Sequence, residues 1–269
     1  MSKAFIHFWI LAAAFFGTWF VLSQVDFVEI FHVEQLTKEN EHRIGEFVLN
    51  AVKRGNEELD SEAVQACVDS IKRRLCEANG IEDTSIAVHV LVKDDVNAFA
   101  LPDRHLVIYT GLIHYCKSPE ELSGVIAHEI GHMEGKHVMK KLAKEVGLSM
   151  LSTVAGGESS GEIGREMVKL LSSTAFDREQ ETEADIAAVH MMATAGIDPE
   201  NLADFLFRLS QEKNNIPKHF EWLSTHPNSQ DRSAEILKLR KKENWTSRPI
   251  TDEDTWDSVK SIVSEASGN

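Results

Sequence analysis

Residues 118–132 read SPEELSGVIAHEIGH and predict a helix with two histidines on one face. Ser118 can cap this helix, and Pro119 suits its first position. His128 and His132 are four residues apart, so their rings lie about 40° apart around the axis and one turn apart along it. Both imidazoles can therefore reach a single metal ion.

The residue after the first histidine completes an H-E-x-x-H pattern. Glu129 lies next to the face of His128 and His132, where it can act as general base on a metal-bound water without being a ligand. Apolar neighbours indicate a buried helix, in which a histidine pair without a metal or hydrogen bonds would be costly. The pattern predicts a zinc-dependent hydrolase.

A catalytic zinc takes three protein ligands and leaves its fourth place to water, so a third donor is needed. The best source is the predicted helix at 178–185, REQETEAD. Glu181 and Asp185 share its face of small residues, whereas Glu179 and Glu183 point about 160° away. We expect Glu181 to be the third ligand of one Zn²⁺ per chain. Asp185, one turn on, is placed to accept a hydrogen bond from a ligand histidine.

The segments HEIGH at 128–132 and ETEAD at 181–185, in this order, resemble the HtpX and CaaX-prenyl-protease family of zinc metallopeptidases, which are gluzincins. The resemblance covers roughly residues 85–240. It implies zinc at His128, His132 and Glu181, with Glu129 as the base. The chain lacks the several transmembrane helices of those branches, so it looks more like the short single-anchor or periplasmic branch, and prenylated substrates are not expected.

Two further segments take part in the resemblance. NAFALP at 97–102 is similar to the family's edge strand beside the active site, which implies that a peptide substrate pairs with Asn97, Ala98 and Phe99. STHP at 224–227 is similar to the family's T-H-P loop.

We expect His226 in this loop to donate to the oxyanion of the reaction, or alternatively to bind zinc in a resting state. Arg232 is expected either to hold Asp185 or the loop in place, or to form a surface ion pair.

The fold class that follows is α+β. Helical spacing runs over 34–54 and 61–79, and almost everything after residue 118 is helical. β-branched runs at 86–92 and 106–109 predict strands. With the resemblance, we expect a mostly α-helical zincin-type metallopeptidase domain with a small antiparallel β-sheet and an N-terminal membrane helix.

The N-terminal segment is the candidate membrane element. Residues 4–22 carry no charge, and a helix of that length rises roughly 28 Å, close to the thickness of a bilayer. Lys3 before it and acids after it orient the body outside the cytoplasm. A signal peptide cleaved after Ser23 is the alternative. We expect an anchor or signal peptide at 1–25, a catalytic domain at 30–244 and an acidic tail at 245–269.

Composition narrows the function further. With 28 Lys+Arg against 43 Asp+Glu, the net charge of -15 argues against nucleic-acid binding. Three cysteines make no disulfide framework. The sequence thus predicts an anchored zinc endopeptidase outside the cytoplasm, and the resemblance implies a periplasmic enzyme that hydrolyses misfolded or misassembled polypeptides. The alternative is a non-catalytic, zinc-containing, chaperone-like binding protein of the cell envelope, for which Glu129 would have no use.

Overall fold

The computed structural model describes residues 37–157, 160–212 and 220–267, together with seven residues scattered between 5 and 17. The chain divides into two units, Met1–Thr37 and Lys38–Asn269. Most of the segment expected to form a membrane helix, residues 4–22, lies outside the described residues. Among the residues that are described, no helix has the length and apolar character needed to cross a bilayer.

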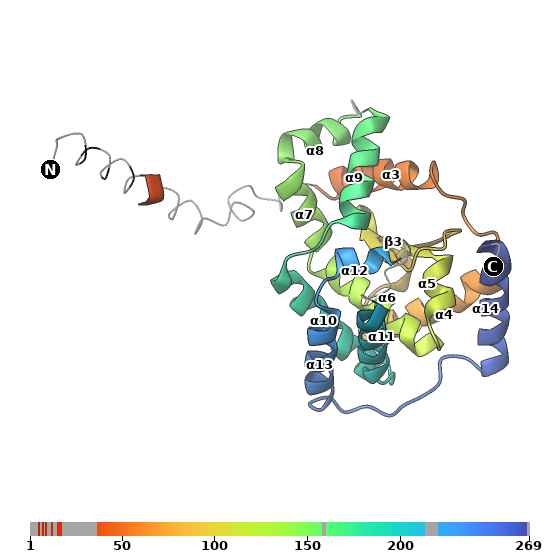
Figure 1. The fold of residues 1–269 in the computed structure, drawn as a ribbon. Coiled ribbons are helices and arrows are strands. Elements are labelled where there is room, and N and C mark those ends of the chain that lie inside the picture. Colours follow the sequence, from red (N-terminus) through yellow and green to blue (C-terminus); the bar gives the residue numbers. More distant parts are fainter. Residues whose placement is uncertain are drawn as a thin grey trace. The chain divides into compact units, whose positions relative to one another are not determined.

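The second unit is mostly helical, with one small sheet (Figure 1). Its helices are α3 (Lys38–Lys53), α4 (Glu62–Ala78), α5 (Thr110–Tyr115), α6 (Pro119–Glu134), α7 (His137–Glu145), α8 (Leu148–Ala155), α9 (Gly161–Ser173), α10 (Arg178–Thr194), α11 (Glu200–Gln211), α12 (Glu221–Thr225), α13 (Ser229–Arg240) and α14 (Glu253–Ser267). Its strands are β1 (Ala87–Leu91), β2 (Ala98–Leu101) and β3 (His105–Tyr109), and the short 3-10 turns are η2 (Asp83–Ser85) and η3 (Pro102–Arg104).

The sheet has the order β1-β3-β2 and is mixed, so the prediction of an antiparallel sheet is wrong for one of its two pairs. β2 runs antiparallel to β3, whereas β1 runs parallel to it. The cause is the connection: after β1 the chain passes to the far side of β3, forms β2 there, and reverses at η3. β3 then returns between the two other strands in the direction of β1.

Helix α6 is the centre of the second unit. It packs against α10, α11, α4 and β2, and Ser118 caps it by accepting a hydrogen bond from Glu121 N. Gly124 lets α11 approach closely, since a Cβ there would come within 2.8 Å of Leu202 Cβ. α7, α8 and α9 gather with α3 on one side of the unit, and α10, α11 and α13 on another (Figure 1).

The C-terminal residues 245–269 include a packed helix. α14 contacts α5 and α4, and it buries Trp256, Val259 and Val263. Trp256 Nε1 donates a hydrogen bond to the backbone oxygen of Lys117, just before α6 begins. The three cysteines, Cys67, Cys76 and Cys116, are all buried and unbridged.

Candidate metal centre and active site

Helix α6 carries three of the predicted site residues into the interior. His128, Glu129 and His132 are all completely buried. The two histidines stand one turn apart with their Nε2 atoms 3.0 Å from each other. Burial lowers the pKa of His132 to about 3, although Glu181 opposes the shift, so this ring is in the neutral form that binds metals.

Helix α10 brings the third donor to this pair because the two helices cross at very short distance. Gly131, inside the H-E-x-x-H segment, faces Ala184, and a Cβ at Gly131 would lie 3.0 Å from the Ala184 backbone. Glu181, one turn before Ala184, therefore reaches the pair: its Oε1 lies 3.4 Å from His132 Nε2.

The loop between α12 and α13 adds a fourth donor, His226. Its Nδ1 lies 2.8 Å from Glu181 Oε1 and 3.2 Å from His128 Nε2. The facing atoms of His128, His132, Glu181 and His226 all lie within 4.8 Å of one another. Four of the distances between these atoms fall between 2.8 and 3.4 Å.

This donor set suits a zinc ion. Zn–N and Zn–O bonds of about 2.0–2.2 Å place tetrahedral ligands roughly 3.3–3.6 Å apart, close to the separations found here. Three imidazoles and one carboxylate are donors that zinc prefers. The ring nitrogens of His128, His132 and His226 face one another and the carboxylate of Glu181 across a small buried space, and a cation at its centre would bind their lone pairs.

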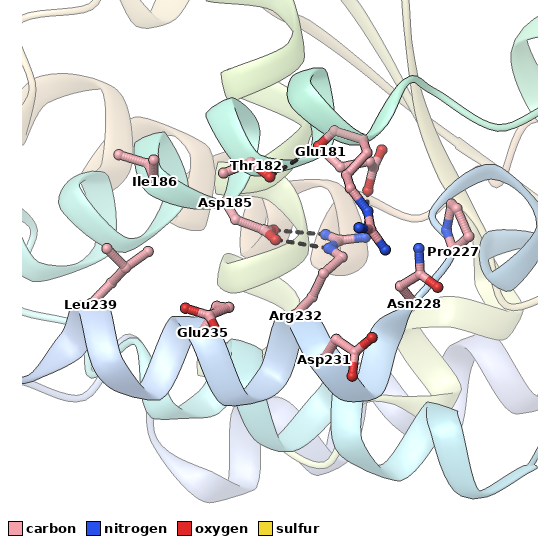
Figure 2. A pocket seen from close by; sticks show the side chains of 11 residues that line it. Glu181, Thr182, Asp185, Ile186, Pro227, Asn228, Asp231, Arg232, Glu235 and Leu239 are labelled. Carbon is pink, nitrogen blue, oxygen red and sulfur yellow. Dashed lines mark hydrogen bonds and ion pairs between the residues drawn. The ribbon is translucent and has the colours of Figure 1, made fainter.

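Behind His128 lies a buried ion pair. His128 Nδ1 is 3.0 Å from Asp185 Oδ1, which places the carboxylate to accept the ring proton and leave Nε2 facing the cluster. Arg232 donates two parallel hydrogen bonds to Asp185, of 2.8 and 2.7 Å (Figure 2). Asp185 and Arg232 are 5% and 8% exposed, so the pair is buried rather than at the surface. Arg232 also pairs with Glu181.

Behind His132 lies a second histidine. His132 Nδ1 is 2.9 Å from His137 Nδ1, and His137 Nε2 is 3.0 Å from Glu183 Oε2. His137 is completely buried, whereas the side chain of Glu183 is 57% exposed. Because a carboxylate only accepts, His137 donates from Nε2 and accepts the Nδ1 proton of His132. A hydrogen-bonded relay thus runs from the cluster to the surface.

Helical periodicity does not predict this relay, because it extends the helix of residues 118–132 without a break to His137. On one unbroken helix His137 would lie about 140° around the axis from His132. The chain instead leaves the helix at Gly135, passes through Lys136 with a φ of 54°, and starts α7 at His137. Gly135 was the only local signal for that break.

Glu129 faces the cluster with one oxygen and the sheet with the other. Its Oε2 accepts a hydrogen bond of 3.0 Å from Ala100 N on β2, and its Oε1 lies 3.3 Å from His226 Nε2. Burial raises the pKa of Glu129, but the hydrogen bond and charge of His226 outweigh burial, so the pKa lies below its usual value. Glu129 is therefore ionised and able to accept a proton.

An aromatic side chain that the sequence did not reveal closes one wall. Phe176 stacks on His132 with ring centroids 4.0 Å apart, and it lies nearly parallel to His226 at 5.7 Å. Lys141 Nζ lies 4.0 Å from the centre of the Phe176 ring and donates to the backbone oxygen of Thr174. The cluster is thus walled from solvent on this side.

The strand expected to hold substrate lies inside the protein in this structure. Asn97, Ala98 and Phe99 are at most 1% exposed. Asn97 Nδ2 donates to the backbone oxygen of Ser172 in α9, and Trp222 N in α12 donates to Val96 O. α9 and α12 therefore cover the region of β2 beside the cluster.

A pocket of about 510 Å³ opens next to the cluster (Figure 2). It lies between α10 and α13, with Glu181, Asp185 and Arg232 in its wall and Ile186 and Leu239 adding apolar surface. This pocket brings the protein surface to the carboxylate of the expected third ligand.

A buried H-E-x-x-H helix crossed by a helix that supplies a glutamate defines the class of zinc metalloproteases. The sequence profile of peptidase family M48 matches residues 62–240, more than half of the chain. The chain therefore belongs to peptidase family M48, whose members are zinc-dependent metalloprotease hydrolases. The prediction of a zinc metallopeptidase is confirmed at this level.

Several characterised proteins are similar to this chain. The mitochondrial metalloendopeptidase OMA1 of Schizosaccharomyces pombe is 28% identical over 180 residues, which are 66% of this chain and 52% of that protein. The beta-barrel assembly-enhancing protease of Yersinia pestis is 25% identical over 208 residues, 71% of this chain and 42% of that protein. Metalloprotease LoiP of Escherichia coli is 28% identical over 193 residues, 67% of this chain and 75% of that protein. The chain thus spans about half the length of the first relative and less of the second.

Proposed function

We propose that the chain is a zinc endopeptidase in which His128, His132 and Glu181 hold the metal and Glu129 is the general base. The observation that carries the proposal is the convergence of these donors, with the free carboxylate of Glu129 beside them. Membership of family M48 supports the same reading and implies polypeptide substrates.

The residues of the site divide the chemical work. When bound, zinc lowers the pKa of a coordinated water and polarises the carbonyl of the scissile peptide. Ala100 N–H holds Glu129 Oε2, which leaves Oε1 to take a proton and later return it to the leaving amine. Asp185, held by Arg232, keeps His128 in the tautomer that presents Nε2 to the metal.

His226 gives the site a closed arrangement. Its Nδ1 lies at the place of a fourth ligand, and its Nε2 faces Glu129. We propose that substrate displaces His226 from this place and that its ring then donates to the carbonyl oxygen of the substrate as negative charge develops there. The same opening would uncover Asn97, Ala98 and Phe99 for pairing with an extended peptide.

The physiological setting is a further part of the proposal. Residues 4–22 would hold the catalytic domain outside the cytoplasm, with domain limits at 1–25, 30–244 and 245–269, as in the short single-anchor or periplasmic branch. Similarity to a protein named for assembly of β-barrels supports misassembled envelope proteins as substrates. The mass of the mature protein, together with the membrane fraction that retains it, tests this setting. A mass that corresponds to a chain beginning near residue 24 would contradict the anchor.

Replacement of Glu129 by Gln tests the catalytic proposal. We expect Glu129→Gln to bind zinc as the wild type does and to lose hydrolysis of an unfolded polypeptide by at least about a hundredfold, because the base is gone. Zinc content and peptide release are measured on the same preparations. A wild type that binds zinc and an unfolded chain, without cleavage that depends on Glu129, would instead indicate the chaperone-like alternative.

A further inference from the structure

A second group of histidines and carboxylates lies where α3 packs against the turn between β2 and β3. His42 and Glu46 are one turn apart on α3, so they share a face, while Asp103 lies in the turn and His105 begins β3. His105 Nε2 is 3.5 Å from Glu46 Oε1 and 3.9 Å from Asp103 Oδ2. The same oxygen of Asp103 is 2.5 Å from His42 Nδ1.

The backbone is shaped to bring α3 next to Asp103 and His105. Gly45, between His42 and Glu46, allows α3 to approach the turn, because a Cβ at Gly45 would lie 2.6 Å from both Asp103 Cβ and Pro102 O. α3 therefore lies directly against η3, and the side chains on either side of Gly45 face Asp103 and His105.

The hydrogen bonds behind His105 decide which of its nitrogens carries the proton. Glu58 Oε1 is 3.0 Å from His89 Nδ1, and His89 Nε2 is 3.1 Å from His105 Nδ1. Since the carboxylate only accepts, His89 donates from Nδ1 and accepts at Nε2 the proton of His105 Nδ1. His105 Nε2 is then left with a lone pair.

That lone pair is directed at negative charge. His105 is 7% exposed, and its buried Nε2 has no hydrogen-bond partner among the described residues. Burial lowers the pKa of both His89 and His105, which favours neutral rings. A cation beside this lone pair and the carboxylates of Glu46 and Asp103 would relieve their repulsion. The hydrogen bond with Asp103 raises the pKa of His42, so a metal ion would replace the proton on that ring.

We propose that His42, Glu46, Asp103 and His105 bind a divalent transition-metal cation at a site separate from the H-E-x-x-H cluster. Two imidazoles and two carboxylates form a set that Zn²⁺ accepts, and the two carboxylates neutralise its charge. The separations from His105 approach the roughly 3.3–3.6 Å of tetrahedral zinc ligands. The side chains of His42 and Glu46 are 59% and 47% exposed, so the site is accessible to cations from solvent.

The cation would connect α3 to the sheet. α3 supplies two of the ligands, and the β2–β3 turn and β3 supply the others. α3 also packs against α8 and α9, and α9 covers the strand beside the catalytic cluster. Occupancy of this site therefore stabilises the side of the domain that covers β2.

Titration of the metal-free full-length chain with Zn²⁺, followed by calorimetry, tests the proposal. We expect two zinc equivalents for the wild type. His105→Gln and Glu46→Gln should each bind one, and His128→Gln should bind the other one. His190→Gln is the matched control, since His190 is exposed and belongs to neither cluster, and it should bind two.

The variants separate this site from the catalytic proposal. One equivalent in the wild type, lost in His128→Gln and kept in His105→Gln, overturns the second site. The second site is also overturned if His105→Gln and Glu46→Gln each bind two equivalents of zinc, as the wild type does. One equivalent lost in His105→Gln and kept in His128→Gln upholds the second site and overturns the catalytic zinc. Glu46→Gln, at a half-exposed position, guards against misfolding of the His105 variant.

Discussion

The two histidines that we propose as zinc ligands are supported in different ways. His128 rests directly on Asp185, whose charge Arg232 balances inside the protein. His132 rests on another histidine, and the relay ends at the exposed carboxylate of Glu183. The support of His128 is short and charged and lies in the wall of the pocket between α10 and α13, whereas that of His132 is long, has a neutral ring in its middle and ends at an exposed carboxylate.

The difference shows that one histidine of the cluster has a buried carboxylate as its acceptor and the other has a second imidazole. The cluster at α3 repeats the longer plan, since His105 rests on His89 and Glu58. In both places a neutral second imidazole accepts a hydrogen bond from the buried histidine and donates one to an exposed carboxylate. The carboxylate therefore stays in contact with water, and the cost of desolvating it is avoided. The predictions that follow measure the two sides against each other.

The largest effect is expected at the buried ion pair behind His128. Asp185→Ala leaves the Arg232 guanidinium buried without its main partner, so we expect the free energy of unfolding of the metal-free protein to fall by about 3–5 kcal/mol. Urea denaturation measures it. Asp198→Ala is the matched control, because Asp198 also pairs with an arginine through two bonds but is a quarter exposed, and it should cost at most about 1 kcal/mol. Equal losses of unfolding free energy in the two variants would show that burial does not set the strength of the ion pair.

On the relay side, the acceptor is the part that matters. His137→Ala removes the acceptor of the His132 Nδ1 proton, and we expect zinc affinity to fall about 10–100-fold. Competition with a chelator measures the affinity, and the visible spectrum of the Co²⁺ form reports the geometry. His137→Asn, whose side-chain oxygen can take the place of Nδ1, should recover most of both. Equal losses in the two variants would show that only packing had been lost.

The pKa of Lys141 measures how strongly the side chains beside His132 are shielded from water. Burial lowers its pKa to about 8, against the opposing charges of Glu181 and Glu129, while the unfolded value is near 10.5. Below pH 8 the charged Lys141 therefore lowers the free energy of unfolding, and this loss of stability disappears as the pH rises from about 8 to 10.5. Lys141→Met should raise the unfolding free energy at pH 7 by about 1–3 kcal/mol and remove this pH-dependent rise. Urea denaturation at several pH values measures both effects, and a variant no more stable than the wild type would count against a dry wall.

The smallest effect is expected at the outer end of the relay. Glu183→Gln keeps an acceptor for His137 Nε2 and changes only an exposed charge, so zinc affinity should fall less than about fivefold. Glu179→Gln, an exposed neighbour outside the relay, is the control for net charge. A loss as large as that of His137→Ala would place the important group of the relay at the surface.

The spacing of side chains within α6 and within α10 could be predicted from the sequence because each is a continuous helix. The four-residue steps from His128 to His132 and from Glu181 to Asp185 place side chains in the order the structure shows, and Ser118 caps α6 as expected. The helices predicted at 34–54 and 61–79 correspond to α3 (Lys38–Lys53) and α4 (Glu62–Ala78), and residues 34–36 lie outside the described residues.

The rest depends on contacts between segments far apart in the sequence. His137 joins His132 only because α6 breaks at Gly135, and Phe176 reaches the cluster from a loop without periodicity. The parallel pairing of β1 with β3 depends on which edge β2 takes. His89 and His105, which look like ordinary structural histidines in the sequence, meet only across paired strands.

The buried cysteines make the protein convenient for site-specific labelling. Burial raises the pKa of each thiol, to about 11 for Cys76, so the reactive thiolate form is scarce at neutral pH. A cysteine introduced at an exposed position such as Glu183 or Glu39 would therefore react first with a maleimide probe. Fluorescent or spin labels placed in this way could follow the opening of the site without removal of the native thiols.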